Sequence, residues 1–463
     1  MVDERAQARA QIRGTKQGAE SDLLARKNVI GVDIADKETD GKNTGQLAIV
    51  VFVDAKQPMS KLSAADRVPK EIDGIPTDVQ EMTVELQGPS MELVDEVTPQ
   101  VDTTAYSTLH GGISMGPLRS VYLTPPDVPS AGNYIFAGTL GAMVRDRGNG
   151  ATMALTNFHV ACVNNTWSVG DRMVQPSLLD GGSSGNQFGS LSRATLSDAV
   201  DGSVVTVDTG KSTTASVQDI GDVAGHTAAT VGAAVRKRGR TTELTYGTVV
   251  STDFTVSINY GSDVGSHTLH HQIRIQTDTS QSARFSDHGD SGSVIMDGNR
   301  MVVGLLFAGS SDGQWTFANP IQSVLDELNV DLMVAPVVTR PIISCLNTRL
   351  VVCNITRPAA CVLTRTAGCN VTRTVVCITT RTVTCNITTR AASCPVLTRT
   401  PTCNVLLTRA GCNIPIPDPG PVENGQVDDG HGYGATTDLP EEYWAGYLAA
   451  LEEVNELDQS DEV

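Results

Sequence analysis

Hydrophobic positions divide the N-terminal part of the chain into one helical segment followed by short strands. Residues 1–28 place Ala, Gln, Arg and Glu at helical spacing, which predicts an N-terminal helix. Apolar runs at 28–34 and 47–53 flank an Asp-Gly turn signal and predict a pair of strands, and residues 75–86 return to strand-like character. We therefore expect residues 1–86 to form a small α+β accessory domain.

The next two segments differ in their content of turn-forming residues. Residues 87–130 are rich in Pro, Gly, Ser and Thr, which predicts a connector. From 131 to 335, short runs of Val, Ile and Thr alternate with Gly and Asp, a pattern typical of a β-sandwich or barrel. Residues 321–328 predict a helix that closes this region. The expected fold class of the chain is therefore mainly β.

Two segments of opposite charge follow the β-rich region. Residues 336–417 carry nine Arg and no Asp, Glu or Lys, whereas residues 418–463 carry 13 acidic residues and no Lys or Arg. The acidic tail ends at 440–457 in a pattern that predicts one amphipathic helix bearing aromatic residues. Two roles stay open for this helix, docking on the body of the protein and recruiting a partner.

The basic segment is a low-complexity repeat built on Thr-Arg and Cys. Nine of the ten cysteines lie in it, at intervals of eight residues five times and then nine residues three times. On an extended chain, an eight-residue period would place the Arg and Cys side chains on one face. One interpretation is a β-prone extension ordered only by stacking on itself. The other is a functional element: a string of cleavage sites, a platform for thiol modification or metal capture, or a basic arm for a polyanion.

Charge and composition exclude several classes of function. A net charge of −18 argues against a protein whose whole surface binds nucleic acid or an anionic membrane. The repeat has no aromatic residue on which bases could stack, so we do not expect nucleic acid as a partner. Without a run of 18 apolar residues or a signal-like N-terminus, we expect a cytoplasmic protein without membrane association. The odd number of repeat cysteines then favours reduced thiols.

Candidate catalytic residues occur in the β-rich region in the order His, Asp, Ser. A serine hydroxyl becomes a useful nucleophile when an imidazole takes its proton and a carboxylate orients that imidazole. We therefore predict His159 as general base, Asp201 as its orienting carboxylate and Ser291 as nucleophile. Glycine beside the serine allows a tight turn whose backbone N–H groups can bind an oxyanion, so Gly289 and Ser291 are the expected donors.

These motifs resemble the trypsin-like (chymotrypsin-fold) serine proteases, particularly their bacterial branch. The most specific match is Gly-Asp-Ser-Gly at 289–292, and the segment around His159 resembles that family's strand-to-helix histidine motif. The intervals from His to Asp and from Asp to Ser, 42 and 90 residues, suit the family's double barrel. Segments 235–249 and 303–309 resemble the strand pair that opens the second barrel and the strand that lines the substrate cleft. The resemblance covers about residues 130–333 and implies a chymotrypsin-like double β-barrel that hydrolyses peptide bonds.

The chain departs from the family pattern at the position that governs specificity. Trypsins that cleave after Lys or Arg place an aspartate six residues before the serine, where this chain has Phe285, so cleavage after Arg is not implied. Phe285, Asp287 and His288 are candidates for shaping the substrate pocket. The half-cystine that often follows the family's histidine is also absent. Cys162 lies three residues on, and we expect it to be a buried packing residue.

Several neighbouring residues have a second interpretation. Asp198 could replace Asp201, which we prefer because it directly precedes a β-rich apolar run, as the resemblance requires. We expect Asp290 to form a buried salt bridge or hydrogen bond that shapes the oxyanion loop. Of the other histidines, His226 and the pair at 270–271 have no Cys or carboxylate partner at ligand spacing, so we expect no metal and no cofactor.

The leading hypothesis is a serine endopeptidase that acts on protein or peptide substrates. The Cys/Arg repeat, its own or a partner's, is a candidate substrate, and the repeat or the terminal helix is a candidate site for recruiting a partner. The alternative is a catalytically idle protease-fold scaffold that presents the repeat.

Overall fold

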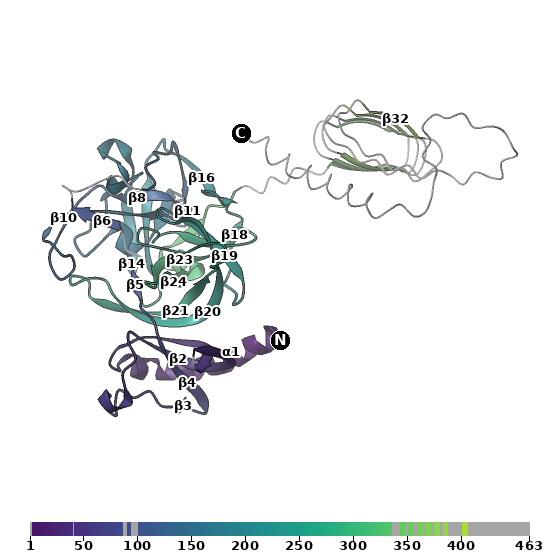
Figure 1. Ribbon diagram of the computed structural model, residues 1–463. Coiled ribbons are helices and arrows are strands. Elements are labelled where there is room, and N and C mark those ends of the chain that lie inside the picture. Colours follow the sequence, from purple (N-terminus) through teal and green to yellow (C-terminus); the bar gives the residue numbers. More distant parts are fainter. Residues whose placement is uncertain are drawn as a thin grey trace, which may run out of the picture. The chain divides into compact units, whose positions relative to one another are not determined.

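The computed structural model of the protein describes residues 2–39, 41–86, 90–93 and 101–335, and seven strands between residues 343 and 405. The chain forms two compact units, Met1–Pro336 and Val337–Val463 (Figure 1). The acidic tail and its predicted helix lie outside the described residues. The expectation of a mainly β fold is confirmed, because strands are far more extensive than helices in the larger unit.

The first barrel of the larger unit is a closed β-sheet. Its strands are β8 (Ile113–Pro117), β10 (Gly132–Leu140), β11 (Ala142–Asp146), β12 (Thr152–Thr156), β13 (Arg172–Val174), β14 (Gln187–Leu196) and β15 (Asp201–Val207). Hydrogen-bonded neighbours run β8, β13, β14, β15, β12. The continuous segment β10–β11 closes the ring, because β10 pairs with β8 and β11 pairs with β12.

The second barrel of the larger unit is also a closed β-sheet. Its strands are β19 (Ala234–Gly239), β20 (Glu243–Asn259), β21 (Ser266–Thr277), β22 (Val294–Asp297), β23 (Met301–Gly309) and β24 (Trp315–Pro320). Neighbours run β19, β22, β23, β24, β21, β20, and β20 pairs again with β19. Two barrels of this kind agree with the double β-barrel that the sequence predicts.

The first barrel begins earlier than the composition suggests. β8 lies inside the expected connector 87–130, as do β9 (Val121–Leu123), β7 (Thr108–Gly111) and β6 (Ser90–Leu93). All five residues of β8 are buried although they include Gly, Ser and Pro. Turn-forming residues therefore dominate the composition of this segment without preventing a short barrel strand. β7 joins β16 (Ser212–Val217) and β17 (Gly221–Asp222) in a small separate sheet.

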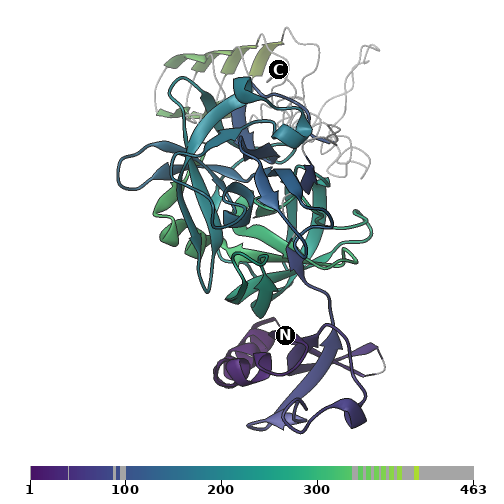
Figure 2. The same ribbon diagram turned by 90° about the vertical axis from the view of Figure 1, so that its left-hand side faces the viewer.

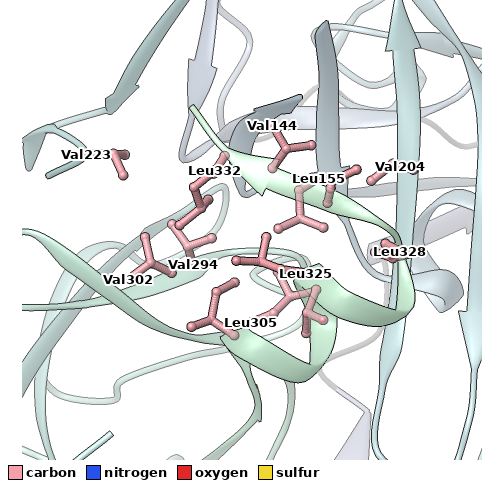
Figure 3. Close-up of a cluster of buried hydrophobic side chains, with 14 of the residues drawn as sticks. Val144, Leu155, Val204, Val223, Val294, Val302, Leu305, Leu325, Leu328 and Leu332 are labelled. Carbon is pink, nitrogen blue, oxygen red and sulfur yellow. The ribbon is translucent and has the colours of Figure 1, made fainter. Parts of the chain in front are cut away.

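An apolar cluster joins the two barrels (Figure 3). Val144 and Leu155 come from the first barrel, Val294 and Leu305 from the second, and Leu325 from α3 (Ile321–Glu327). α3 confirms the predicted closing helix, and β25 (Val330–Leu332) then pairs with β11, so the chain returns to the first barrel. This shared core fixes groups on the two barrels relative to one another.

The N-terminal part of the larger unit, residues 2–81, is a small sheet covered by one helix, and we call it the N-terminal unit. α1 (Val2–Leu24) packs on β1 (Val29–Thr39) and β2 (Lys42–Val53), which confirms the predicted helix and strand pair. β4 (Ile75–Glu81) pairs in parallel with β2 and antiparallel with β3 (Glu71–Ile72), and a 3₁₀ turn, Met59–Lys61, lies between. The stretch 75–86 is not one strand, because β5 (Glu85–Leu86) leaves this sheet and pairs with β23.

The N-terminal sheet is joined to the second barrel by backbone pairing and buried charge. β1 pairs antiparallel with β20, Gly31 opposite Val256. A Cβ at Gly31 would lie 2.9 Å from both the Phe254 ring and the Thr255 carbonyl oxygen, so this close approach requires glycine. Beside it, Arg274 Nε donates to Asp33 Oδ2 at 2.9 Å, both side chains being buried.

The strands β26 to β31 of the smaller unit alternate between two parallel sheets, and β32 pairs with β31 (Figure 1). One sheet contains β26 (Ile343–Asn347), β28 (Ala359–Leu363) and β30 (Val375–Thr379); the other contains β27 (Val351–Ile355), β29 (Ala367–Val371), β31 (Val383–Ile387) and β32 (Pro401–Val405). Pairing is in register, with Cys345 opposite Cys361 and Cys353 opposite Cys369. Strands that begin two octapeptides apart in the sequence are therefore paired.

No helix among the described residues combines the length and apolar character that crossing a membrane requires.

The cluster between the barrels predicts a large loss of stability on truncation. Leu305 is fully buried there, so Leu305→Ala is expected to lower the free energy of unfolding by about 2–5 kcal/mol. Val169→Ala is the control, because Val169 is 71% exposed and its truncation should change stability by less than about 0.5 kcal/mol. Urea unfolding followed by tryptophan fluorescence measures both, and equal effects would contradict the assignment of this core.

Candidate active site

His159 and Asp201 meet where two strands of the first barrel lie side by side. β12 pairs antiparallel with β15, Thr156 opposite Ser203. His159 follows in the single-turn helix α2 (Phe158–Ala161), and its Nδ1 lies 2.5 Å from Asp201 Oδ2. The His159 backbone N–H also donates to Asp201 Oδ1 at 3.3 Å. The carboxylate therefore fixes the orientation of the ring and favours the tautomer with its proton on Nδ1.

Asp201 is held by further donors and acceptors that sequence reasoning missed. The Tyr260 hydroxyl donates to Asp201 Oδ2 at 3.0 Å, and the Asp201 backbone N–H donates to Asn319 Oδ1 at 3.2 Å. Burial, together with the nearby Asp201 charge, raises the pKa of Tyr260 well above its usual value, so its hydroxyl stays a donor. Both residues belong to the second barrel, and no spacing pattern links them to the predicted His, Asp and Ser.

The other aspartate considered for this role lies elsewhere. Asp198 is exposed, and its backbone carbonyl accepts a hydrogen bond from His270 N–H at 2.7 Å. The structure therefore brings Asp201 to His159 and leaves Asp198 at the surface.

Ser291 lies in a tight loop with two left-handed glycines. Gly289 has φ +92° and Gly292 has φ +94°, and the Asp290 N–H donates to the Asp287 carbonyl at 3.0 Å. A Cβ on Gly292 would lie 2.2 Å from the Thr139 carbonyl oxygen and 2.3 Å from Thr156 Oγ1. Only glycine allows this approach. Since Thr156 ends the strand that leads to His159, the serine loop lies against that strand.

Hydrogen bonds from Thr139 attach the serine loop to the first barrel. Thr139 N–H donates to the Ser291 carbonyl at 2.9 Å, and Thr139 Oγ1 donates to the Gly289 carbonyl at 2.9 Å. The same Oγ1 accepts from Arg240 N–H at 3.0 Å. With its carbonyls occupied in this way, the loop keeps a single backbone conformation.

The polar groups that chemistry would use are not bonded to one another. Ser291 Oγ donates to the Phe307 carbonyl at 3.2 Å, and His159 Nε2 is buried without a hydrogen-bond partner. Within the described residues, no hydrogen bond is recorded from the backbone N–H of Gly289 or Ser291. One basic nitrogen and two backbone donors are thus free to bind groups of another molecule.

Asp290 stabilises the loop through a buried ion pair. Its carboxylate lies 3.2 Å from Lys237 Nζ, both side chains being fully buried, and accepts from the backbone N–H of Thr241, Thr242 and Asp287. Burial lowers the pKa of Lys237, and the Asp290 charge opposes this shift. Asp290 therefore has the structural role that the sequence suggests for it.

The three pocket candidates have different environments. Phe285 is fully buried in an apolar cluster with Val235 and Ile275, and its ring lies 6.0 Å from Lys237 Nζ. Asp287 pairs with Arg284, and the side chain of His288 is 54% exposed. Phe285 thus belongs to the packed core of the second barrel, whereas Asp287 and His288 are partly exposed.

The remaining sequence candidates lie in structural environments. Cys162 is buried in an apolar cluster of the first barrel, where burial raises the pKa of its thiol. His270 Nδ1 lies 2.9 Å from Glu20 Oε2 of α1, and His226 is exposed. In the part of the chain that the structure describes, no group of three or more His, Cys, Asp or Glu is placed to hold a metal ion.

Removing Lys237 should leave a buried carboxylate without its counter-charge. Lys237→Met is expected to lower the free energy of unfolding by about 3–5 kcal/mol, because breaking one side of a buried ion pair leaves an uncompensated charge. Arg147→Met is the control, since Arg147 pairs with Asp326 and Asp331 at the surface and should matter little. Chemical unfolding measures both variants, and a similar small effect in each would contradict the role assigned to Lys237.

The solved structures to which this chain is similar include bacterial serine proteases of chymotrypsin-like fold. No family model and no curated protein matches the chain. Among solved structures, Thermobifida fusca Protease A is 21% identical, with a TM-score of 0.35, and the match covers 49% of this chain and 100% of that chain. Nocardiopsis Protease is 20% identical, with a TM-score of 0.35, and the match covers 49% of this chain and 98% of that chain. Cellulomonas bogoriensis chymotrypsin is 21% identical, with a TM-score of 0.34, and the match covers 49% of this chain and 100% of that chain. The likeness concerns the fold of about half the chain.

Proposed function

We propose that the protein is a serine endopeptidase that hydrolyses peptide bonds of protein substrates. The observation that carries the proposal is the buried pair of His159 Nδ1 and Asp201 Oδ2, whose imidazole keeps Nε2 free of other partners. A second support is the serine loop beside the strand that leads to His159, with two backbone N–H groups available. Neither arrangement serves the packing of the barrels, because each leaves a buried polar group unused.

The proposed reaction follows from these positions. His159 Nε2 takes the proton of Ser291 Oγ as that oxygen bonds to the substrate carbonyl carbon, and Asp201 stabilises the imidazolium that forms. The N–H groups of Gly289 and Ser291 bind the developing oxyanion. His159 then protonates the leaving amine, and a water molecule repeats the sequence on the acyl-enzyme. No step requires a cofactor.

A second candidate function is an idle scaffold, and one observation favours it. Ser291 Oγ donates to the Phe307 carbonyl, and the side chain is fully buried, so the serine is neither paired with His159 nor exposed. A scaffold would present the repeat without using these groups.

We further propose the repeat as a substrate or recruiting element of this endopeptidase, acting in the cytoplasm. Seven of its Thr-Arg pairs, the first at 348–349 and the last at 398–399, fall in the sequence between the strands β26 to β32. Cleavage at these pairs would fall outside the seven strands that the structure describes in the repeat.

Labelling with a fluorophosphonate tests the enzyme against the scaffold. The serine oxygen displaces fluoride from phosphorus and the serine proton leaves with it, so an activated Ser291 gains the mass of one probe less HF. We expect the parent protein to gain one probe after long incubation and Ser291→Ala to gain none, as measured by intact mass. Absence of any gain in the parent would support the scaffold and contradict the endopeptidase.

Tyr260 is expected to act as a positioning residue for Asp201. A hydrogen bond to a charged group contributes about 1.5–3 kcal/mol, so Tyr260→Phe should lower kcat about 10- to 100-fold and leave KM nearly unchanged. Tyr134→Phe is the matched control, because the Tyr134 hydroxyl donates to the Ser130 carbonyl away from the site. Steady-state hydrolysis of an unfolded protein measures both, and an unchanged kcat in Tyr260→Phe would show that Tyr260 only fills space.

A further inference from the structure

Two short strands that precede the first barrel in the sequence each pair with one of the barrels. We define residues 83–86 and 90–93 together as the strap, which contains β5 and β6 (Figures 1 and 2). β5 pairs antiparallel with the end of β23, Leu86 opposite Ala308. β6 pairs antiparallel with β10, Ser90 opposite Ala137. The strap is therefore hydrogen-bonded to both barrels.

The two pairings lie on either side of the candidate nucleophile. Ala308 follows Phe307, whose carbonyl accepts from Ser291 Oγ. Ala137 lies two residues before Thr139, whose N–H donates to the Ser291 carbonyl. The described parts of the strap are therefore paired with the two strands whose residues contact Ser291.

The edge that β5 occupies is one to which an extended peptide would bind. β22 pairs with β23 only as far as Leu305, so it does not reach Ala308 and Gly309. On their other side, these two residues pair with β24. Without β5, one side of this segment would present unpaired backbone groups next to Ser291. An added strand satisfies such groups irrespective of its side chains, which suits protein substrates of varied sequence.

Side chains anchor the strap at both ends. Thr83 Oγ1 lies 2.7 Å from Ser311 Oγ and accepts from the Ser311 N–H at 3.2 Å. Leu86 packs on the apolar cluster that contains Phe307, and Leu93 packs on a cluster of the first barrel. These contacts hold the strap without any covalent link to the site.

The candidate catalytic groups are covered in this arrangement. Ser291 is 0% exposed and His159 is 2% exposed, and His159 Nε2 is buried without a partner. A polar atom that is covered and unpaired is costly, so this nitrogen is placed for a ligand rather than for stability.

The start of the strap is fixed by the N-terminal unit. Met82 N–H donates to the Val53 carbonyl at 3.0 Å, directly before the strap begins, and β1 pairs with β20 of the second barrel. Docking of the N-terminal unit therefore raises the local concentration of the strap at the site, as a short linker does for any tethered ligand.

We propose that the strap is an internal competitor that occupies the substrate-binding edge of the candidate active site and that protein substrates must displace. The inference rests on the proposed endopeptidase function, and it adds the regulation of that site by this chain's own residues 83–86 and 90–93. Because only molecules with the strap released can bind substrate, apparent affinity falls by the released fraction.

A strap-loosened variant tests this proposal through the serine. Leu86→Gly combined with Leu93→Gly removes both apolar anchors and should raise the rate of fluorophosphonate labelling of the full chain at least about tenfold. The control is Leu24→Gly combined with Leu47→Gly, two half-buried leucines of the N-terminal cluster outside the strap and its anchors, which should label at the parent rate. Equal rates in the loosened variant and the parent, both labelling, would overturn the strap's role and leave the endopeptidase standing.

A binding measurement separates the strap from the chemistry. In the Ser291→Ala background, a fluorescent peptide with the sequence of residues 83–93 should bind the loosened variant and should not bind the parent or the control. Binding of this kind without labelling of any variant would support the strap and overturn the proposed enzyme. The thermal midpoint shows whether the loosened variant is folded. If that midpoint is unchanged and the variant binds no peptide, the proposed role of the strap is overturned.

Discussion

The hydrogen bonds of Thr139 to the serine loop are the contacts on which the site depends. His159 and Asp201 come from the first barrel and Ser291 from the second, so their relative position is set only by contacts between barrels. Thr139 supplies two of these contacts by bonding to the carbonyls of Gly289 and Ser291. The apolar cluster beneath gives the rigidity that such short contacts need. A shift between barrels would separate base from nucleophile before it unfolded either barrel.

Buried charge holds the same loop from its other side. The Asp290 carboxylate accepts backbone hydrogen bonds from both β19–β20 and the serine loop, while Lys237 supplies the opposite charge. Taking two charges out of water costs free energy that their attraction only partly returns. The arrangement is explained by the conformation it imposes, in which the N–H groups of Gly289 and Ser291 stay available.

Local patterns predicted the first helix, the first strand pair, α3 and the mainly β class, because each depends on short-range spacing. The order of His159, Asp201 and Ser291 also predicted which segments the fold brings together around Thr156 and Gly292. Tyr260 and Asn319 could not be predicted, since their contacts with Asp201 join residues 59 or more positions apart without any motif. The departure of β5 from the N-terminal sheet escaped prediction for the same reason, because a two-residue strand has no period.

The alternating sheets of the repeat impose a parity on its length. From β26 to β31, successive octapeptides enter opposite sheets, so strands of one sheet recur after two units. Gain or loss of two units would add or remove one whole coil and preserve the partner of every other strand. A change of one unit would transfer every following strand to the opposite sheet and bring together cysteines that had been in separate ladders. A repeat of this kind therefore keeps the membership of its two sheets only when its length changes by an even number of octapeptides.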